Sequence, residues 1–130
     1  MPLNHIQVRD NSLLDVFLRV RAPAVQQACL SLIVNSAQLR GFHTKSSGEG
    51  EKKHFGYWRD DQNWFAFIAN NEWLLFYFRH PFLERVNLAV EEVRVAFPNA
   101  EVNPKGEMTV KIRDLCDSNA VQTFIGRFSF

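Results

Sequence analysis

Aromatic and cationic residues near the middle of the chain have the types and spacing of a contact surface. Trp73, Tyr77 and Arg79 recur at even intervals along one apolar run, which places them on one face of a strand. Trp and Tyr combine a large apolar body with a polar atom and are frequent at interfaces. An Arg side chain can stack on a ring or hold a carboxylate or phosphate. We predict a binding surface on these three residues, joined by Trp58 and Arg59 of the preceding run.

The same residue types also suit single-stranded nucleic acid, where stacking on a ring contributes ~1–3 kcal/mol per base. Lys52 and Lys53, with Lys45, would supply the positive edge of such a platform. The chain has 15 Lys+Arg against 14 Asp+Glu, and its formal net charge is only +1. Phosphate binding depends on local positive charge, so this balance weakens the hypothesis. We therefore place nucleic acid second, after a protein partner.

A third hypothesis is a small enzyme or ligand-binding protein with a site near His54 and Arg79. Zinc needs three or four converging donors, and the chain has no HExxH or CxxC pattern. It also lacks a GxSxG nucleophile motif, and the carboxylates of Asp60 and Asp61 fall in a predicted turn. The Gly48–Gly50 stretch lacks the order of a phosphate-binding loop. We predict no catalytic residue, no metal and no cofactor, and therefore binding without catalysis.

Cysteine usage and the first residues of the chain indicate a reducing compartment. Cys29 and Cys116 lie far apart in the sequence, and residues 1–5 do not resemble a signal peptide. The expectation is a cytoplasmic protein with two free thiols, and a single disulfide is the alternative. The longest apolar runs, such as 73–78, are far shorter than the ~20 residues of a membrane helix. We expect no membrane association.

The elements that must position the aromatic residues follow from periodicity and turn signals. Helical spacing predicts helices at 12–20 and from Pro23 to about residue 39, before Gly41. Three aromatic-rich runs at 55–59, 64–69 and 73–79, separated by short turns, predict an antiparallel meander. A middle helix is expected from Pro81 to just before Pro98. A hairpin of 101–103 and 108–113 follows, and then a C-terminal helix.

This order predicts an α+β fold in a single domain spanning residues 1–130. Its sheet would be antiparallel with about five strands, packed with two N-terminal helices, the middle helix and the C-terminal helix. The segment 43–53 is polar, contains Gly48 and Gly50 and lacks periodicity. We predict a mobile surface loop there.

Two structural alternatives decide whether the aromatic surface is available. Neither 64–69 nor 73–79 alternates cleanly between apolar and polar residues, so both sheet faces are either covered by helices or used for contact. Instead of contacting a partner, Arg79 can form a salt bridge with Glu84. Trp64 can join the predicted surface beside Trp58.

The last residues of the sequence add a second apolar feature. Phe128 and Phe130 are unusually apolar for a chain end, so they either pack on the body of the protein or contact a second copy. Self-association through these two rings or through the aromatic sheet is a further expectation.

Overall fold

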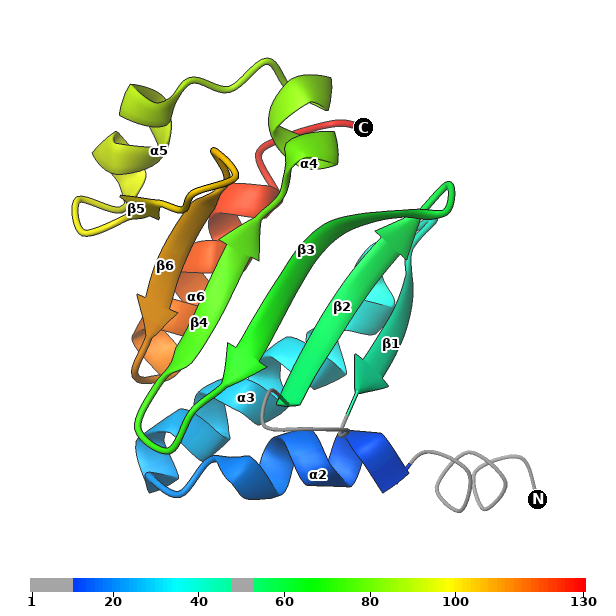
Figure 1. The fold of residues 1–130 in the computed structure, drawn as a ribbon, viewed down its shortest axis with the longest axis vertical. Coiled ribbons are helices and arrows are strands. Elements are labelled where there is room, and N and C mark those ends of the chain that lie inside the picture. Colours follow the sequence, from blue (N-terminus) through cyan, green and yellow to red (C-terminus); the bar gives the residue numbers. More distant parts are fainter. Residues whose placement is uncertain (1–10, 48–52) are drawn as a thin grey trace.

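The computed structural model describes residues 11–47 and 53–130, which form one antiparallel sheet with helices packed against it (Figure 1). The helices are α2 (Asn11–Arg19), α3 (Pro23–Asn35), α4 (His80–Arg85), α5 (Val90–Ala96) and α6 (Leu115–Ile125), with a short 3-10 helix η1 (Ser36–Gln38) after α3. The strands are β1 (His43–Ser47), β2 (Lys53–Arg59), β3 (Gln62–Ala69), β4 (Leu74–Phe78), β5 (Glu101–Val102) and β6 (Met108–Ile112).

The sheet confirms the α+β class and adds one strand to the expected number. Its order in space is β1-β2-β3-β4-β6-β5, and every neighbouring pair of strands is antiparallel. The β2–β3 hairpin turns at Asp60 and Asp61, which have φ angles of 52° and 60°. Two successive residues at positive φ match the twist of the flanking strands, as in a type I′ turn.

The additional strand is β1, in a segment whose composition predicts a loop. His43–Ser47 pairs along its length with β2, from His43 opposite Trp58 to Ser47 opposite His54. An edge strand exposed to solvent needs no run of apolar residues, which is why its sequence resembles a loop. The hydroxyl of Ser12 in α2 donates to the backbone carbonyl of Ser46 at 3.2 Å and fixes the strand to the helical layer. The rest of the predicted loop, 48–52, lies outside the described residues.

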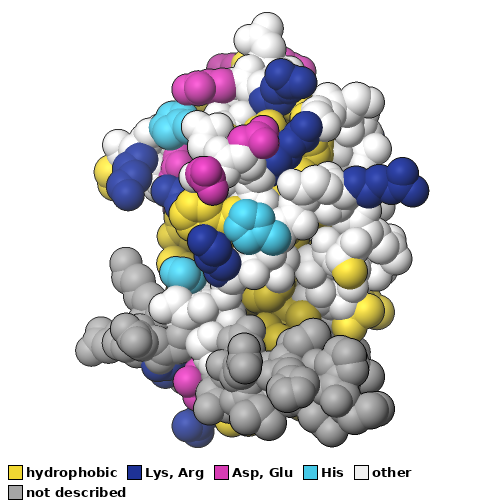
Figure 2. Space-filling model, turned by 90° about the vertical axis from the view of Figure 1, so that its right-hand side faces the viewer, with side chains coloured by type: hydrophobic (Ala, Val, Ile, Leu, Met, Phe, Trp, Pro, Cys, Tyr) yellow, Lys and Arg dark blue, Asp and Glu magenta, His cyan; other side chains and the backbone are white. Residues whose placement is uncertain are grey.

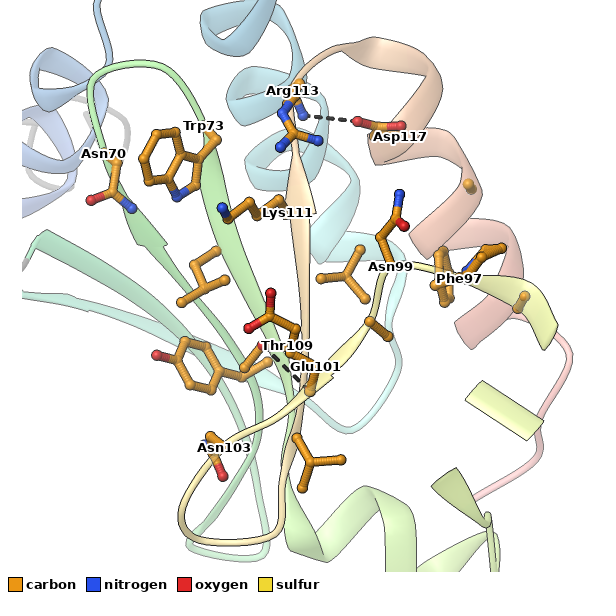
Figure 3. A pocket seen from close by; sticks show the side chains of 18 of the residues that line it. Asn70, Trp73, Phe97, Asn99, Glu101, Asn103, Thr109, Lys111, Arg113 and Asp117 are labelled. Carbon is orange, nitrogen blue, oxygen red and sulfur yellow. Dashed lines mark hydrogen bonds between the residues drawn. The ribbon is translucent and has the colours of Figure 1, made fainter. Parts of the chain in front are cut away.

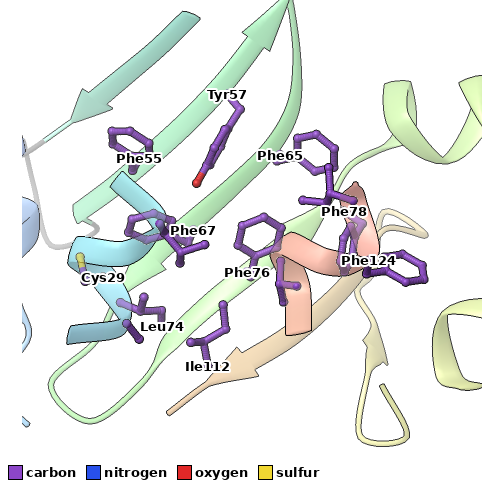
Figure 4. Packing of buried hydrophobic residues seen from close by; sticks show 14 of the residues in the cluster. Cys29, Phe55, Tyr57, Phe65, Phe67, Leu74, Phe76, Phe78, Ile112 and Phe124 are labelled. Atoms are coloured by element: carbon purple, nitrogen blue, oxygen red, sulfur yellow. The ribbon is translucent and has the colours of Figure 1, made fainter. Parts of the chain in front are cut away.

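One face of the sheet carries the core, and α2, α3 and α6 pack over it (Figures 1 and 4). Register sets this face, because Phe55, Phe67, Phe76 and Val110 are successive partners across four strands. The largest fully buried side chains include Phe65, Phe67, Phe76, Phe78, Leu74 and Ile112. Ser118 of α6 donates to the carbonyl of Ala28 in α3, and this hydrogen bond joins the two helices over the sheet.

The expected middle helix is divided into two, which corrects the sequence-based boundary. Asn87 takes φ 51° after α4, and the amide of Leu88 donates to the carbonyl of Leu83 at 3.0 Å. This six-residue bond with a left-handed residue inside it is the usual way for a helix to end, and Asn tolerates that conformation better than most residues. Glu92 then accepts a hydrogen bond from the amide of Ala89 and supports the start of α5. The apolar spacing runs through both helices and therefore does not reveal the break.

Candidate functional site

The second face of the sheet has none of the described helices over it, and we call it the open face. It is formed by the residues that alternate with the core positions: Lys45, His54, Gly56, Trp58, Ala66, Ile68, Trp73, Leu75, Tyr77, Thr109 and Lys111. Exposure separates the two faces along a single strand, because Phe76 in β4 is fully buried while its neighbours Leu75 and Tyr77 are half-buried. The hypothesis of helices on both faces is therefore wrong for the described part of the chain.

Trp58 lies across a glycine at the centre of this face. A Cβ atom added at Gly56 would come within 3.0 Å of the Trp58 Nε1 and 3.0 Å of the Asn63 Nδ2. Any larger residue at this position would have to push the indole or the Asn63 amide aside. Lys45, opposite Gly56 in β1, places its Nζ 4.7 Å from the centre of the Trp58 ring. That distance permits a cation–π interaction, so the lysine and the indole form one unit.

Trp73 forms a second pair of this kind at the other side of the open face. The Nζ of Lys111 in β6 lies 4.8 Å from the centre of the Trp73 ring, and Figure 3 shows the lysine directed toward the indole. Trp73, Leu75, Tyr77, Thr109 and Lys111 also line a cleft of about 930 Å³. β5 pairs only with Met108 and Thr109, and the cleft continues past β6 to Phe97 and Asn99. The cleft thus joins the open face to the outer edge of β6.

Arg79 has a partner within the chain. Its Nε donates to the Oε2 of Glu107 at 3.0 Å, and Glu107 also accepts from the amide of His80 and from Asn103. The ion pair with Glu84 that the sequence suggested is replaced by this one, because β4 and β6 are neighbours in the sheet. Burial alone would raise the pKa of Glu107, but the hydrogen bonds from Arg79 and Asn103 and the charge of Arg79 lower it.

The Arg79–Glu107 pair predicts a specific loss of stability in acid. Since the folded-state pKa of Glu107 lies below its ordinary value of 4.5, the pair stabilises the fold above pH 4.5 and loses its contribution as pH falls through the lower folded value. Glu107→Gln should reduce the free energy of unfolding by about 1–3 kcal/mol at pH 7. In urea titrations between pH 7 and pH 2, the difference between the native protein and the variant should shrink with falling pH. A difference that stays constant would contradict this role.

His54 is the residue on which a catalytic site was considered. Burial and, after it, the charge of Arg79 lower the pKa of His54, which keeps the imidazole neutral at pH 7. Its Nδ1 is buried and has no hydrogen-bond partner in the described part of the chain. A general base normally has a second group that orients its ring. Residues 11–47 and 53–130 provide no such group for His54.

Arg59 lies apart from Trp73 and Tyr77. Its guanidinium carbon is 5.3 Å from the ring centre of Trp64, 5.7 Å from that of Phe130 and 5.9 Å from that of Phe42. Its Nη1 and the Nε1 of Trp64 are buried without hydrogen-bond partners, while the Nε of Arg59 lies 3.8 Å from the Oδ2 of Asp60 and the arginine side chain stays 24 % exposed. We call Phe42, Arg59, Trp64 and Phe130 the arginine cluster.

A bulge explains why Trp64 belongs to the arginine cluster and not to the open face. Tyr57 pairs with Phe65 while Trp58 pairs with Asn63, so β3 has one extra residue, Trp64, at this point. A bulge interrupts the alternation of side chains between faces. The expectation that Trp64 joins the surface beside Trp58 is therefore wrong. Trp64 is only 5 % exposed.

The C-terminal rings pack within the chain. Phe128 contacts the rings of Phe82 and Phe124, and Phe130 contacts those of Phe42, Trp64 and Phe82. Of the two expected placements, packing on the body is the one observed. Of the two remaining lysines of the predicted site, Lys53 begins β2 and is half-buried, and Lys52 lies outside the described residues.

Several residues of the open face were not singled out from the sequence. Gly56 and Lys111 contribute as much to its shape as the aromatic residues, and Glu107 determines the state of Arg79. Only the pairing of β4 with β6 places Thr109 beside Tyr77 and Lys111 near Trp73. The sequence does not reveal which strands lie side by side in the sheet, and that order brings these residues together.

Other chemical features of the described residues are few. Within them, no group of three or more His, Cys, Asp or Glu side chains is arranged to hold a metal ion. Both cysteines are free, Cys29 buried and Cys116 exposed, and burial raises the pKa of Cys29 to about 12. None of the helices in this part of the chain has the length and apolarity to span a membrane. Comparison with family models, curated proteins and solved structures gives no match.

Proposed function

We propose that this protein is a non-catalytic binding domain that contacts a protein partner through the open face. The observation that carries the proposal is the one-sided covering of the sheet, which leaves Trp58, Trp73 and Tyr77 half-buried and clear of the helical layer. Such residues are among those that contribute most to binding when a partner excludes water from them. Packing against the helices therefore does not explain why these three positions on the open face are aromatic.

The shape of the open face indicates the chemistry of the partner. Gly56 and Ala66 are paired between Trp58 and Tyr77, and both are buried, with the Trp58 indole lying against Gly56. The half-buried rings of Trp58 and Tyr77 present their apolar area to an aromatic or long apolar side chain of the partner. Lys45 and Lys111 stand on either side and favour acidic residues around that anchor. A second copy of the chain is one candidate partner.

Single-stranded nucleic acid is the second candidate, and the lysine–indole pairs are the observation that favours it. Rings with adjacent cations bind bases and phosphates together. Three features place it below a protein partner. Lys45 and Lys111 already lie over the rings on which bases would stack, Arg79 is neutralised by Glu107, and Figure 2 shows acidic side chains interspersed with basic ones on the side of the molecule near β1.

A small enzyme or ligand-binding site at His54 and Arg79 is the third candidate. Because Arg79 is bound to Glu107 and the Nδ1 of His54 is inaccessible, this hypothesis has the least support. We further infer a reducing, cytoplasmic location from the two free thiols.

Site-specific crosslinking tests the proposal with a partner whose identity need not be specified beforehand. A photoreactive benzoylphenylalanine at Tyr77 should capture a partner from a cell extract, and an excess of the unmodified protein should compete for it. The same group at Val95, which is 84 % exposed on α5, is the matched control and should give no competed product. A labelled single-stranded oligonucleotide is added as a second probe at low and high salt. Equal capture from the two positions, or capture of the oligonucleotide alone, would count against a protein partner.

A further inference from the structure

A small cavity lies on the side of the sheet opposite the open face, between α3, η1 and α6. Its volume is about 240 Å³, and its apolar walls are Leu32, Leu39, Phe76 and Ile125. None of the described residues that line it carries a charge. A cavity of about 150 Å³ with similar walls is large enough for benzene, so this one can hold a single ring with a small substituent.

A tyrosine hydroxyl without a hydrogen-bond partner among the described residues belongs to the lining of this cavity. Tyr57 lines the cavity and is 3 % exposed, and its ring packs edge-on against Phe55, Phe65 and Phe76. Figure 4 shows its hydroxyl directed over the middle of the sheet, toward Phe67 and Phe76. That hydroxyl takes part in none of the hydrogen bonds formed by the described residues. A hydroxyl in a cavity wall that has no protein partner is available to an oxygen of a bound molecule.

The protonation state of Tyr57 and the polar groups around it define which kind of molecule can bind in the cavity. Burial and, after it, the nearby thiol of Cys29 raise the pKa of Tyr57, so the hydroxyl keeps its proton and can donate. Gln122 also lines the cavity, and its Nε2 donates to Ser31 and Ser118. These two bonds fix the amide, and its Oε1 has no hydrogen bond among the described residues. A donor and an acceptor are therefore available beside apolar walls.

We propose that this cavity is a binding site for a neutral, single-ring molecule whose hydroxyl or carbonyl oxygen hydrogen-bonds to Tyr57. The absence of charged lining residues excludes a carboxylate or an ammonium group as the preferred ligand, because neither would find a counter-charge among the described residues of the cavity. The apolar walls hold the ring, and Tyr57 selects for the oxygen. This site lies across the sheet from the open face and does not depend on the function proposed for it.

Two probes of equal shape test the proposal by NMR titration of the full chain. Benzyl alcohol carries the hydroxyl, and ethylbenzene replaces it with a methyl group. Both should shift the amide signals of Leu32, Leu39 and Ile125. Tyr57→Phe should weaken benzyl alcohol binding about three- to tenfold and leave the affinity for ethylbenzene within about twofold, since one hydrogen bond is removed and the ring remains.

Two further variants make the outcome specific to the cavity. Tyr77→Phe removes the matching hydroxyl from the open face and should leave both affinities unchanged. Leu39→Trp places a larger side chain at the half-buried rim and should weaken both probes at least about tenfold. Shifts absent from the cavity residues, or equal benzyl alcohol affinity in the native protein and Tyr57→Phe, would overturn the proposal. A cavity that holds only water gives the first of these results.

Discussion

Replacement of Trp73 and Tyr77 by alanine together should weaken binding to the partner captured at Tyr77 by at least about 30-fold, which is the effect of a single strong interface residue. The reason is that both side chains are half-buried on the open face and offer ring area that a partner can cover. Isothermal titration of the purified complex measures the change. Because the two rings line the same cleft, their separate effects are not expected to add.

The same substitutions should have a small effect on folding. Tyr77 alternates with Phe76 and Phe78, which are fully buried, so its removal leaves the core side of β4 intact. Leu18→Ala is a matched control, because Leu18 is an apolar side chain 61 % exposed on α2, away from the open face. It should alter neither affinity nor fold. Unchanged affinity in a folded Trp73→Ala/Tyr77→Ala variant would exclude the open face as the binding surface, and unfolding would show that the rings belong to the core.

Phe65→Ala should lower the free energy of unfolding by about 3–5 kcal/mol, which is a large part of the ~5–15 kcal/mol that stabilises a typical domain. Phe65 is fully buried, and its ring contacts those of Phe42, Tyr57, Phe78 and Phe82. No neighbouring side chain can fill the space without moving out of a close-packed arrangement. Urea denaturation followed by circular dichroism measures the loss.

Val95→Ala is the control for this experiment. Val95 is 84 % exposed, so its replacement should change the free energy of unfolding by less than about 0.5 kcal/mol. A loss below about 1 kcal/mol in Phe65→Ala would mean that the ring is not central to the core. The large difference expected between the two variants reflects burial, since both remove only apolar atoms.

Local patterns were sufficient to predict most elements of this fold. The even spacing of Trp73, Leu75 and Tyr77 placed them on one face, and the structure has them there. Pro23 was expected to begin a helix, and α3 begins at that residue. These features depend on neighbours within a few residues, which a sequence displays directly.

Features that depend on distant segments could not be predicted. Glu107 reaches Arg79 only because β6 lies beside β4, and nothing near either residue indicates that pairing. The bulge at Trp64 is set by the register between β2 and β3, so alternation along β3 alone gives the wrong side. The polar segment His43–Ser47 becomes a strand because β2 offers it an edge. In each case the deciding interaction is long-range.

The one-sided helical layer has a consequence for how such a protein can diverge. Alternate residues of β4 have different roles. Leu74, Phe76 and Phe78 are buried beneath the helices, and Leu75 and Tyr77 between them are not. Under the proposed function, substitutions at the second set would redirect recognition while leaving the folding reaction almost untouched. On that proposal, new binding preferences would be accessible by single mutations, without compensating changes elsewhere in the chain.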